Sequence, residues 1–161
     1  MYKVGDLVVY GRTGVCRVER IDHRDKQDFY ALKPLYQSFD IYTPVNGKVF
    51  IRPVISKEEA HRLIDLIPTV EVEVCESKAL RELAEHYQSA IDSHNCQDLI
   101  ELTMSLYAKK KVVEGRKRKF GAVDERFMKE GEELLFGELA AALEIPVEDV
   151  QQYIAERLDQ V

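Results

Sequence analysis

A run of cations is the part of this sequence whose residue types most clearly imply a chemistry. Residues 107–119 carry seven basic side chains and one acidic side chain, whereas the whole chain of 161 residues has a formal net charge of −6. The basic residues are Lys109, Lys110, Lys111, Arg116, Lys117, Arg118 and Lys119. Such cations displace the counterions that condense on nucleic acid and then contact its phosphates. The alternative is a solvated loop, in which lysines near a helix end complement the helix dipole.

A second group of cations lies between residues 12 and 26, and it consists of Arg12, Arg17, Arg20, Arg24 and Lys26. On a β-rich module these side chains would make one side cationic, which suits an acidic protein surface. The alternative is the ordinary solvation of a strand face.

Motifs for catalysis are missing from the sequence. The four histidines form no HExxH pattern, and there is no P-loop, GxSxG or GxGxxG. His94-Asn95-Cys96 is either a ligand pair or a coincidence at a helix turn. The cysteines, Cys16, Cys75 and Cys96, are odd in number and have no CxxC spacing, which favours a reducing compartment. We therefore expect a cytoplasmic protein that is not an enzyme and needs no metal or cofactor.

Short β-type runs dominate residues 1–55. Residues 2–21 contain two such runs joined by Gly11-Arg12-Thr13-Gly14, which predicts a hairpin. Residues 22–28 form a polar loop, and three more strands are expected over residues 29–33, 39–45 and 48–53. Asn46-Gly47 is a strong two-residue turn signal between the last two strands. Five short antiparallel strands predict a small Tudor- or SH3-like barrel.

Strict alternation along the second strand assigns its side chains to two faces. One face would carry Val15, Arg17, Glu19 and Ile21, and the other would carry Cys16, Val18 and Arg20.

The hydrophobic period changes to that of a helix after Ser56, which opens a capping box with Glu59. The first helix should end at Pro68, and residues 69–75 should form an extended linker. Four further helices are expected, with Leu80, Leu83, Ala84, Tyr87 and Ile91 on the buried face of the first of them. The third helix of the chain should end near Lys111, and the fourth should start near Ala122. Gly131 and Gly137 would permit close helix contacts.

The expected fold class is therefore α+β, with a five-stranded antiparallel barrel followed by an all-α bundle. The domain boundaries are residues 1–55 for the β-module, 56–75 for a helix and linker, and 76–161 for the helical domain.

The first strands also resemble a known family. Residues 3–21, KVGDLVVYGRTGVCRVERI, are similar to the start of the CarD/CdnL family of bacterial transcription regulators that bind RNA polymerase. The same domain occurs in the transcription-repair coupling factor. Tyr30, Leu32, Pro44 and residues 51–56 also match in order. The likeness returns at residues 133–140, ELLFGELA, which favours a full-length member.

The resemblance implies an N-terminal module that binds the polymerase β subunit and a helical module that contacts promoter DNA near the upstream edge of the bubble. Arg24 falls where a family arginine contacts polymerase, and a second family arginine would fall at Tyr42. Arg17 and Arg20 complete the predicted polymerase-binding set, and the basic run would meet DNA phosphates.

The resemblance also implies a tryptophan that wedges at the fork junction in many members, but this chain has none. Leu80 aligns there. It is either an apolar wedge or a core residue, because apolar helix faces usually pack inward.

We expect a regulator of the open promoter complex. The alternatives are a protein-interaction adaptor that never touches DNA, and an enzyme with a site between the modules.

Overall fold

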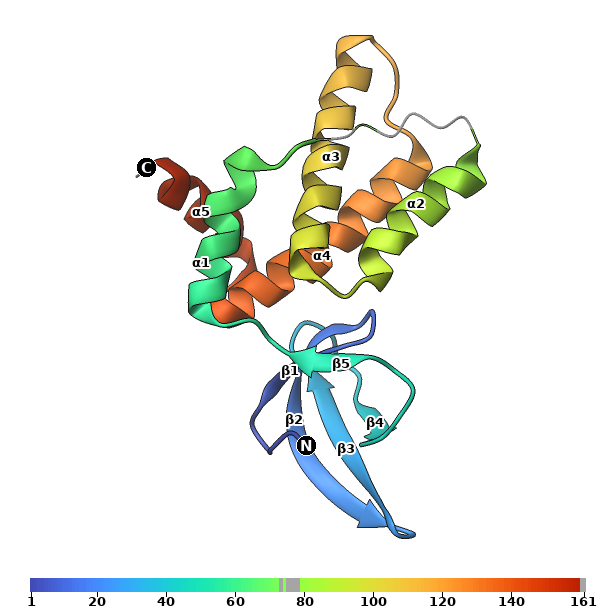
Figure 1. The fold of residues 1–161 in the computed structure, drawn as a ribbon, viewed down its shortest axis with the longest axis vertical. Helices are drawn as coiled ribbons and strands as arrows, with labels where there is room; N and C mark the ends of the chain where they lie inside the picture. The colour runs from blue at the N-terminus through green and yellow to red at the C-terminus, as the bar shows by residue number, and fades with distance from the viewer. Residues whose placement is uncertain (73, 75–78, 160–161) are drawn as a thin grey trace.

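A computed structural model of the chain describes residues 1–72, 74 and 79–159, with a β-module at one end and helices at the other (Figure 1). The predicted α+β class is confirmed. The strands are β1 (Leu7–Tyr10), β2 (Gly14–Arg24), β3 (Gln27–Pro34), β4 (Ile41–Pro44) and β5 (Ile51–Pro53). The helices are α1 (Lys57–Leu66), α2 (Leu80–Asp92), α3 (Cys96–Gly115), α4 (Ala122–Leu143) and α5 (Val150–Asp159), with short 3-10 turns η1 (Ile67–Thr69) and η2 (Val147–Asp149). Part of the predicted linker, with Cys75, lies outside the described residues.

The five strands form one open antiparallel sheet in the order β4-β3-β2-β1-β5. β4 and β5 are its edges and do not pair with each other, so the closed barrel is not confirmed. The expected hairpin through Asn46-Gly47 is wrong, because β5 pairs with β1 instead. Asn46 and Gly47 have no positive φ angle, and the Gly47 N–H donates to the Pro44 carbonyl at 3.0 Å.

The hairpin of β2 and β3 is the longest pairing in the sheet and projects away from the helices (Figure 1). Its register continues to Arg24 opposite Gln27, so the predicted loop over residues 22–28 shrinks to Asp25 and Lys26. Both residues have positive φ angles, 48° and 65°, which a two-residue hairpin turn requires.

A β-bulge interrupts this register at Glu19. Val18 lies opposite Leu32 and Arg20 lies opposite Ala31, so Glu19 has no partner in β3. The extra residue reverses the facing of every side chain that follows it. The predicted faces of β2 are therefore wrong beyond Val18.

The sheet buries its inner face in a small core of its own, made of Val8, Cys16, Val18, Tyr30 and Leu32. Tyr30 is 2 % exposed, and its hydroxyl accepts a hydrogen bond from the Tyr2 N–H at 2.9 Å. On the opposite face, Val9 and Val15 are buried at the end of the sheet that meets α4. Farther along the β2–β3 hairpin the sheet projects away from the described helices (Figure 1).

The helices enclose a larger core that includes Leu63, Tyr87, Leu106, Phe127 and Leu139. Helix α1 starts at Ser56 as expected, since the Ser56 hydroxyl accepts a hydrogen bond from the Glu59 N–H at 3.0 Å. Helix α3 continues to Gly115, past the predicted end near Lys111. Within the described part of the chain, every helix is too short or too polar to cross a bilayer.

Candidate functional site

The outer face of the sheet gathers four residues that the sequence singled out: Arg17, Arg20, Arg24 and Tyr42. The register places Arg20, Ala31 and Tyr42 side by side across β2, β3 and β4. Arg24 lies four residues beyond Arg20 on the same strand and so shares its face. Arg17 lies on this face too. Without the bulge, Arg17 and Arg20 would point to opposite faces, but the extra residue Glu19 places them on the same one.

Stacked side chains hold this surface in place. The rings of Phe29 and Tyr42 lie parallel, with centroids 5.0 Å apart and planes 2° apart. The Arg24 guanidinium carbon lies 5.6 Å from the Tyr42 centroid, within the range of a cation–π contact. Phe29 is a member of this cluster that the sequence analysis did not single out. Its only signal is its place at the start of the third strand, opposite Asp22.

One carboxylate, Asp22, belongs to the same surface and is neutralised there. The Arg20 Nε donates to both Asp22 oxygens, at 2.8 and 3.0 Å, and the Tyr42 hydroxyl donates to one of them at 3.3 Å. The hydrogen bond from Arg20 lowers the pKa of Asp22. The surface, which we call the sheet cluster (Arg17, Arg20, Asp22, Arg24, Phe29 and Tyr42), therefore carries net positive charge.

The second set of predicted residues surrounds the turn between α3 and α4. We call Lys110, Lys111, Arg116, Lys117, Arg118 and Lys119 the basic elbow. All are exposed except Lys110, which is half-buried with its ammonium 6.0 Å from the Phe120 ring centroid. The turn lies at the end of the helical domain farthest from the sheet (Figure 1). Its position suits contact with a second, separate partner.

Lys109 is not part of this exposed surface, so its assignment to DNA is corrected. It is 8 % exposed, and its ammonium lies 2.9 Å from an Asp124 oxygen and 3.4 Å from the Tyr87 hydroxyl. The Tyr87 hydroxyl itself donates to Asp124 at 2.5 Å. A buried charge is stable only with such partners. Lys109 therefore ties α2, α3 and α4 together just below the elbow.

Leu80 is the first residue of α2 and is 66 % exposed, so the prediction of a core position is wrong. Leu83, Tyr87 and Ile91 are buried on the same helix as predicted. The buried residues of α2 begin at Leu83, one turn after Leu80. Because Tyr87 bonds to Asp124 in the first turn of α4, Leu80 lies at the same end of the domain as the elbow.

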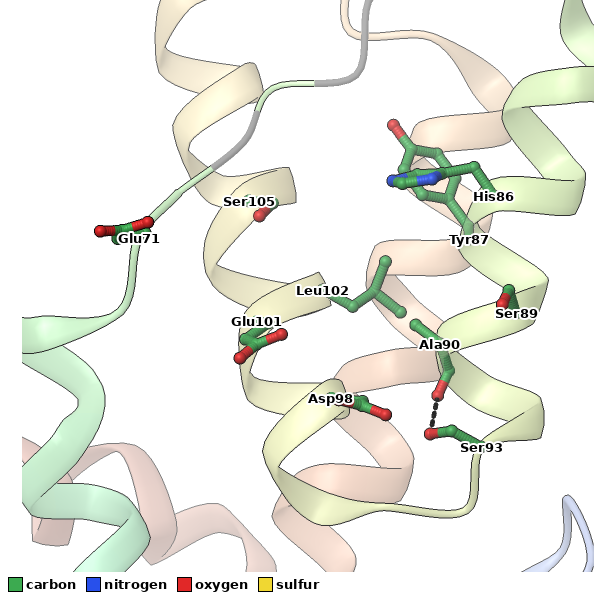
Figure 2. Close-up of a pocket in the computed structure, with 10 residues that line it drawn as sticks. All are labelled: Glu71, His86, Tyr87, Ser89, Ala90, Ser93, Asp98, Glu101, Leu102 and Ser105. Atoms are coloured by element: carbon green, nitrogen blue, oxygen red, sulfur yellow. Dashed lines mark hydrogen bonds between the residues drawn. The ribbon is translucent and has the colours of Figure 1, made fainter.

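A polar pocket of about 350 Å³ separates α2 from α3 (Figure 2). Figure 2 shows His86 and Tyr87 projecting from α2, with Asp98, Glu101 and Ser105 on α3. None of the described lining residues is Lys or Arg, so the pocket does not attract phosphates. Within residues 1–72, 74 and 79–159 no three His, Cys, Asp or Glu side chains are grouped so as to hold a metal ion.

The three residues of His94-Asn95-Cys96, considered above as a ligand pair, have structural roles. The His94 ring stacks on Phe50 with centroids 4.3 Å apart, and the Asn95 side chain caps α3 by accepting from the Gln97 N–H at 2.8 Å. Cys96 is buried, and burial is the main cause of its raised pKa.

Comparison with known families identifies the β-module. Residues 2–55 match the model of the CarD-like/TRCF RID domain. The match covers all five strands, and therefore includes the whole sheet cluster. No curated protein matches the chain.

Proposed function

We propose, on the premise that residues 2–55 are a CarD-like/TRCF RID domain and hence an RNA polymerase-interacting domain, that this chain is a transcription regulator that binds the polymerase β subunit. In this proposal the helical domain contacts upstream promoter DNA and modulates the open complex. No covalent step is involved. The protein acts by adding contacts that are made only when polymerase and DNA are held together.

The observation that carries the proposal is the sheet cluster within the matched domain. Arg24 lies over Tyr42 and interacts electrostatically with Asp22, but it makes no ion pair or hydrogen bond within 1–72, 74 and 79–159, so its N–H donors are available to a partner. A guanidinium that is already stacked loses little freedom when it meets a carboxylate. We therefore assign Arg24 the central polymerase contact, with Arg17 and Arg20 contributing charge around it.

Tyr42 takes the place where the resemblance puts a second arginine. Its ring cannot replace a guanidinium as a donor, but it presents a flat apolar face and fixes Arg24. The free edge of β4, which pairs only with β3, adds backbone groups that a polymerase strand could join. Contact at this edge is therefore aromatic and main-chain in character, with fewer charges than the family pattern implies.

On the DNA side, the proposal uses the basic elbow for phosphates and Leu80 for an apolar contact. The acidic residues elsewhere in the helical domain oppose DNA binding at other faces, which confines the contact to this end. An exposed leucine at the same end of the domain as these cations can enter a minor groove or a frayed base step. It lacks the stacking area and the N–H donor of an indole.

The test is to purify polymerase with the full chain and to measure the lifetime of open promoter complexes with and without it. Co-elution with polymerase and a lifetime that changes on addition support the proposal. Replacing Lys111, Lys117, Arg118 and Lys119 with alanine should then abolish the lifetime effect while co-elution persists. If the lifetime effect is unchanged in that variant, the chain is an adaptor that does not touch DNA.

A further inference from the structure

A buried ion pair joins the two parts of the chain. Arg52, on the edge strand β5, donates from Nη1 and Nη2 to the two oxygens of Glu138 on α4, at 2.6 and 2.7 Å. The Glu138 side chain is 2 % exposed and that of Arg52 is 19 % exposed. The two residues are 86 positions apart in the sequence. The local sequence patterns around them did not predict the contact.

The remaining hydrogen-bonding capacity of the pair is directed to the surrounding backbone. The Arg52 Nε donates to the His94 carbonyl at 2.7 Å, in the turn between α2 and α3. One Glu138 oxygen also accepts from the Ile55 N–H at 3.1 Å, just before α1 begins. The hydrogen bond with Glu138 raises the pKa of Arg52. Three stretches of chain, namely residues 52–55, the turn at His94 and α4, therefore meet at one pair of side chains.

A second contact beside the pair has little room for adjustment. The Tyr36 hydroxyl donates to the Gly137 carbonyl at 2.8 Å, and a Cβ at Gly137 would lie 2.9 Å from the Tyr36 ring. The ring of His94, whose carbonyl accepts from Arg52, also stacks on Phe50. Directional bonds and tight packing of this kind select one orientation of the two modules.

From this geometry we infer that Arg52 and Glu138 are positioning residues, which hold the helical domain at one fixed angle to the sheet cluster. The inference rests on the proposed function, since the angle matters only if polymerase and DNA are bound at the two ends. A rigid joint places the elbow and Leu80 at a set point in space once the sheet cluster has docked. A loose joint would lower their effective concentration at the DNA.

A buried pair of this kind is a better device for orientation than for stability. Replacing both partners with apolar side chains is often neutral for stability, whereas removing one partner leaves an unpaired buried charge. The double replacement therefore distinguishes a role in orientation from a role in stability. It removes the directional bonds between Arg52 and Glu138 without leaving an unpaired buried charge.

The experiment measures the distance between the two domains in the free protein, using spin labels at Gln27→Cys and Glu114→Cys in a Cys75→Ser background. Two variants, which we call the joint variants, change the ion pair: Glu138→Gln and the double variant Arg52→Met/Glu138→Met. The double variant decides the result if the single variant does not fold. The matched control is Arg12→Ala/Glu130→Ala, which removes the exposed ion pair between the same two modules. Polymerase affinity and open-complex lifetime are measured on the same proteins without labels.

We expect a narrow distance distribution in the parent protein and in the control, and a distribution at least about twofold broader in both joint variants. Polymerase affinity should stay within about twofold, while the effect on promoter lifetime falls about tenfold or more, because linked contacts gain roughly 100-fold or more in avidity. Distributions that stay narrow in the joint variants, or that broaden equally in the control, overturn the inference. Failure of the proposed function looks different: the parent protein then binds no polymerase, whatever the distances show.

Discussion

The guanidinium of Arg24 lies over the ring of Tyr42, 5.6 Å from its centroid, and the ring of Phe29 stacks on the same tyrosine. Three strands contribute to this arrangement, and it is exposed on the part of the sheet that no helix covers. An arginine on a rigid aromatic platform is suited to bind a carboxylate on a partner protein. The contact point that we propose for polymerase is therefore already ordered in the free chain.

The salt dependence of DNA affinity should distinguish the basic elbow from the neighbouring buried residue Lys109. Replacing Lys117, Arg118 and Lys119 with alanine removes up to three phosphate contacts, so the slope of log affinity against log salt should fall by about 2 to 3. The measurement is binding of the chain to a polymerase–promoter complex over a range of salt concentrations. An unchanged slope would exclude these residues from the DNA contact.

Lys109→Met is the matched variant, because Lys109 belongs to the same basic run but lies inside the domain. It leaves Asp124 buried without its cation. We expect the slope to stay unchanged and the free energy of unfolding to fall by about 3 to 5 kcal/mol. Denaturant unfolding monitored by circular dichroism provides the measurement, and a fully stable variant would contradict the buried role.

Leu80 offers a test of the wedge. Leu80→Trp places an indole at a helix start that is 66 % exposed. We expect open complexes to live about threefold longer with Leu80→Trp and to lose most of the effect with Leu80→Ala, because apolar insertion depends on the contact area. Equal lifetimes for all three proteins would show that this position does not reach the DNA.

Gly137 should be sensitive to a single methyl group. In Gly137→Ala the added carbon would lie 2.9 Å from the Tyr36 ring, so we expect a loss of about 1 to 3 kcal/mol in the free energy of unfolding. Gly115→Ala is the control, since no atom lies within 4 Å of the added carbon there. The control should be neutral or slightly stabilising. Equal thermal stability of the two variants would argue against close packing at Tyr36.

Alkaline pH should destabilise the β-module through Cys16. Burial raises the pKa of the Cys16 thiol from 9.0 to about 11, so the folded form keeps its proton where the unfolded form loses it. Stability is then complete below pH 9 and declines as pH rises toward 11. Cys16→Ala should show a smaller decline in chemical unfolding over this range. A decline of the same size in both proteins would mean that other groups cause it.

Much of the fold follows from local sequence signals. The opening hairpin, the cap at Ser56 and the start of α4 at Ala122 are set by glycines, a capping side chain and hydrophobic period, all of which can be read from a few neighbouring residues. Gly131 and Gly137 were expected to permit close helix contacts. Gly131 does so, since a Cβ there would lie 3.3 Å from Thr103 on α3, whereas Gly137 approaches Tyr36 in the loop between β3 and β4.

Other features depend on contacts between residues far apart in the chain, and no local sequence pattern predicts them. The bulge at Glu19 has no glycine to mark it, and it decides whether Arg17 and Arg20 share a face. In the sequence, Lys109 cannot be distinguished from the other cations of the basic run. Only the fold shows that it is buried beside Asp124. The turn at Asp25 and Lys26 was missed because neither residue is glycine or asparagine, although both adopt the left-handed conformation.

The most direct test of the account is a titration of the chain onto an isolated fragment of the polymerase β subunit. We predict saturable binding with a dissociation constant in the micromolar range, which Arg24→Ala weakens about tenfold or more. Arg62→Ala, an exposed arginine on α1, should leave that constant unchanged. Absence of binding at about 100 μM by a folded parent protein, or equal losses in both variants, would contradict the account.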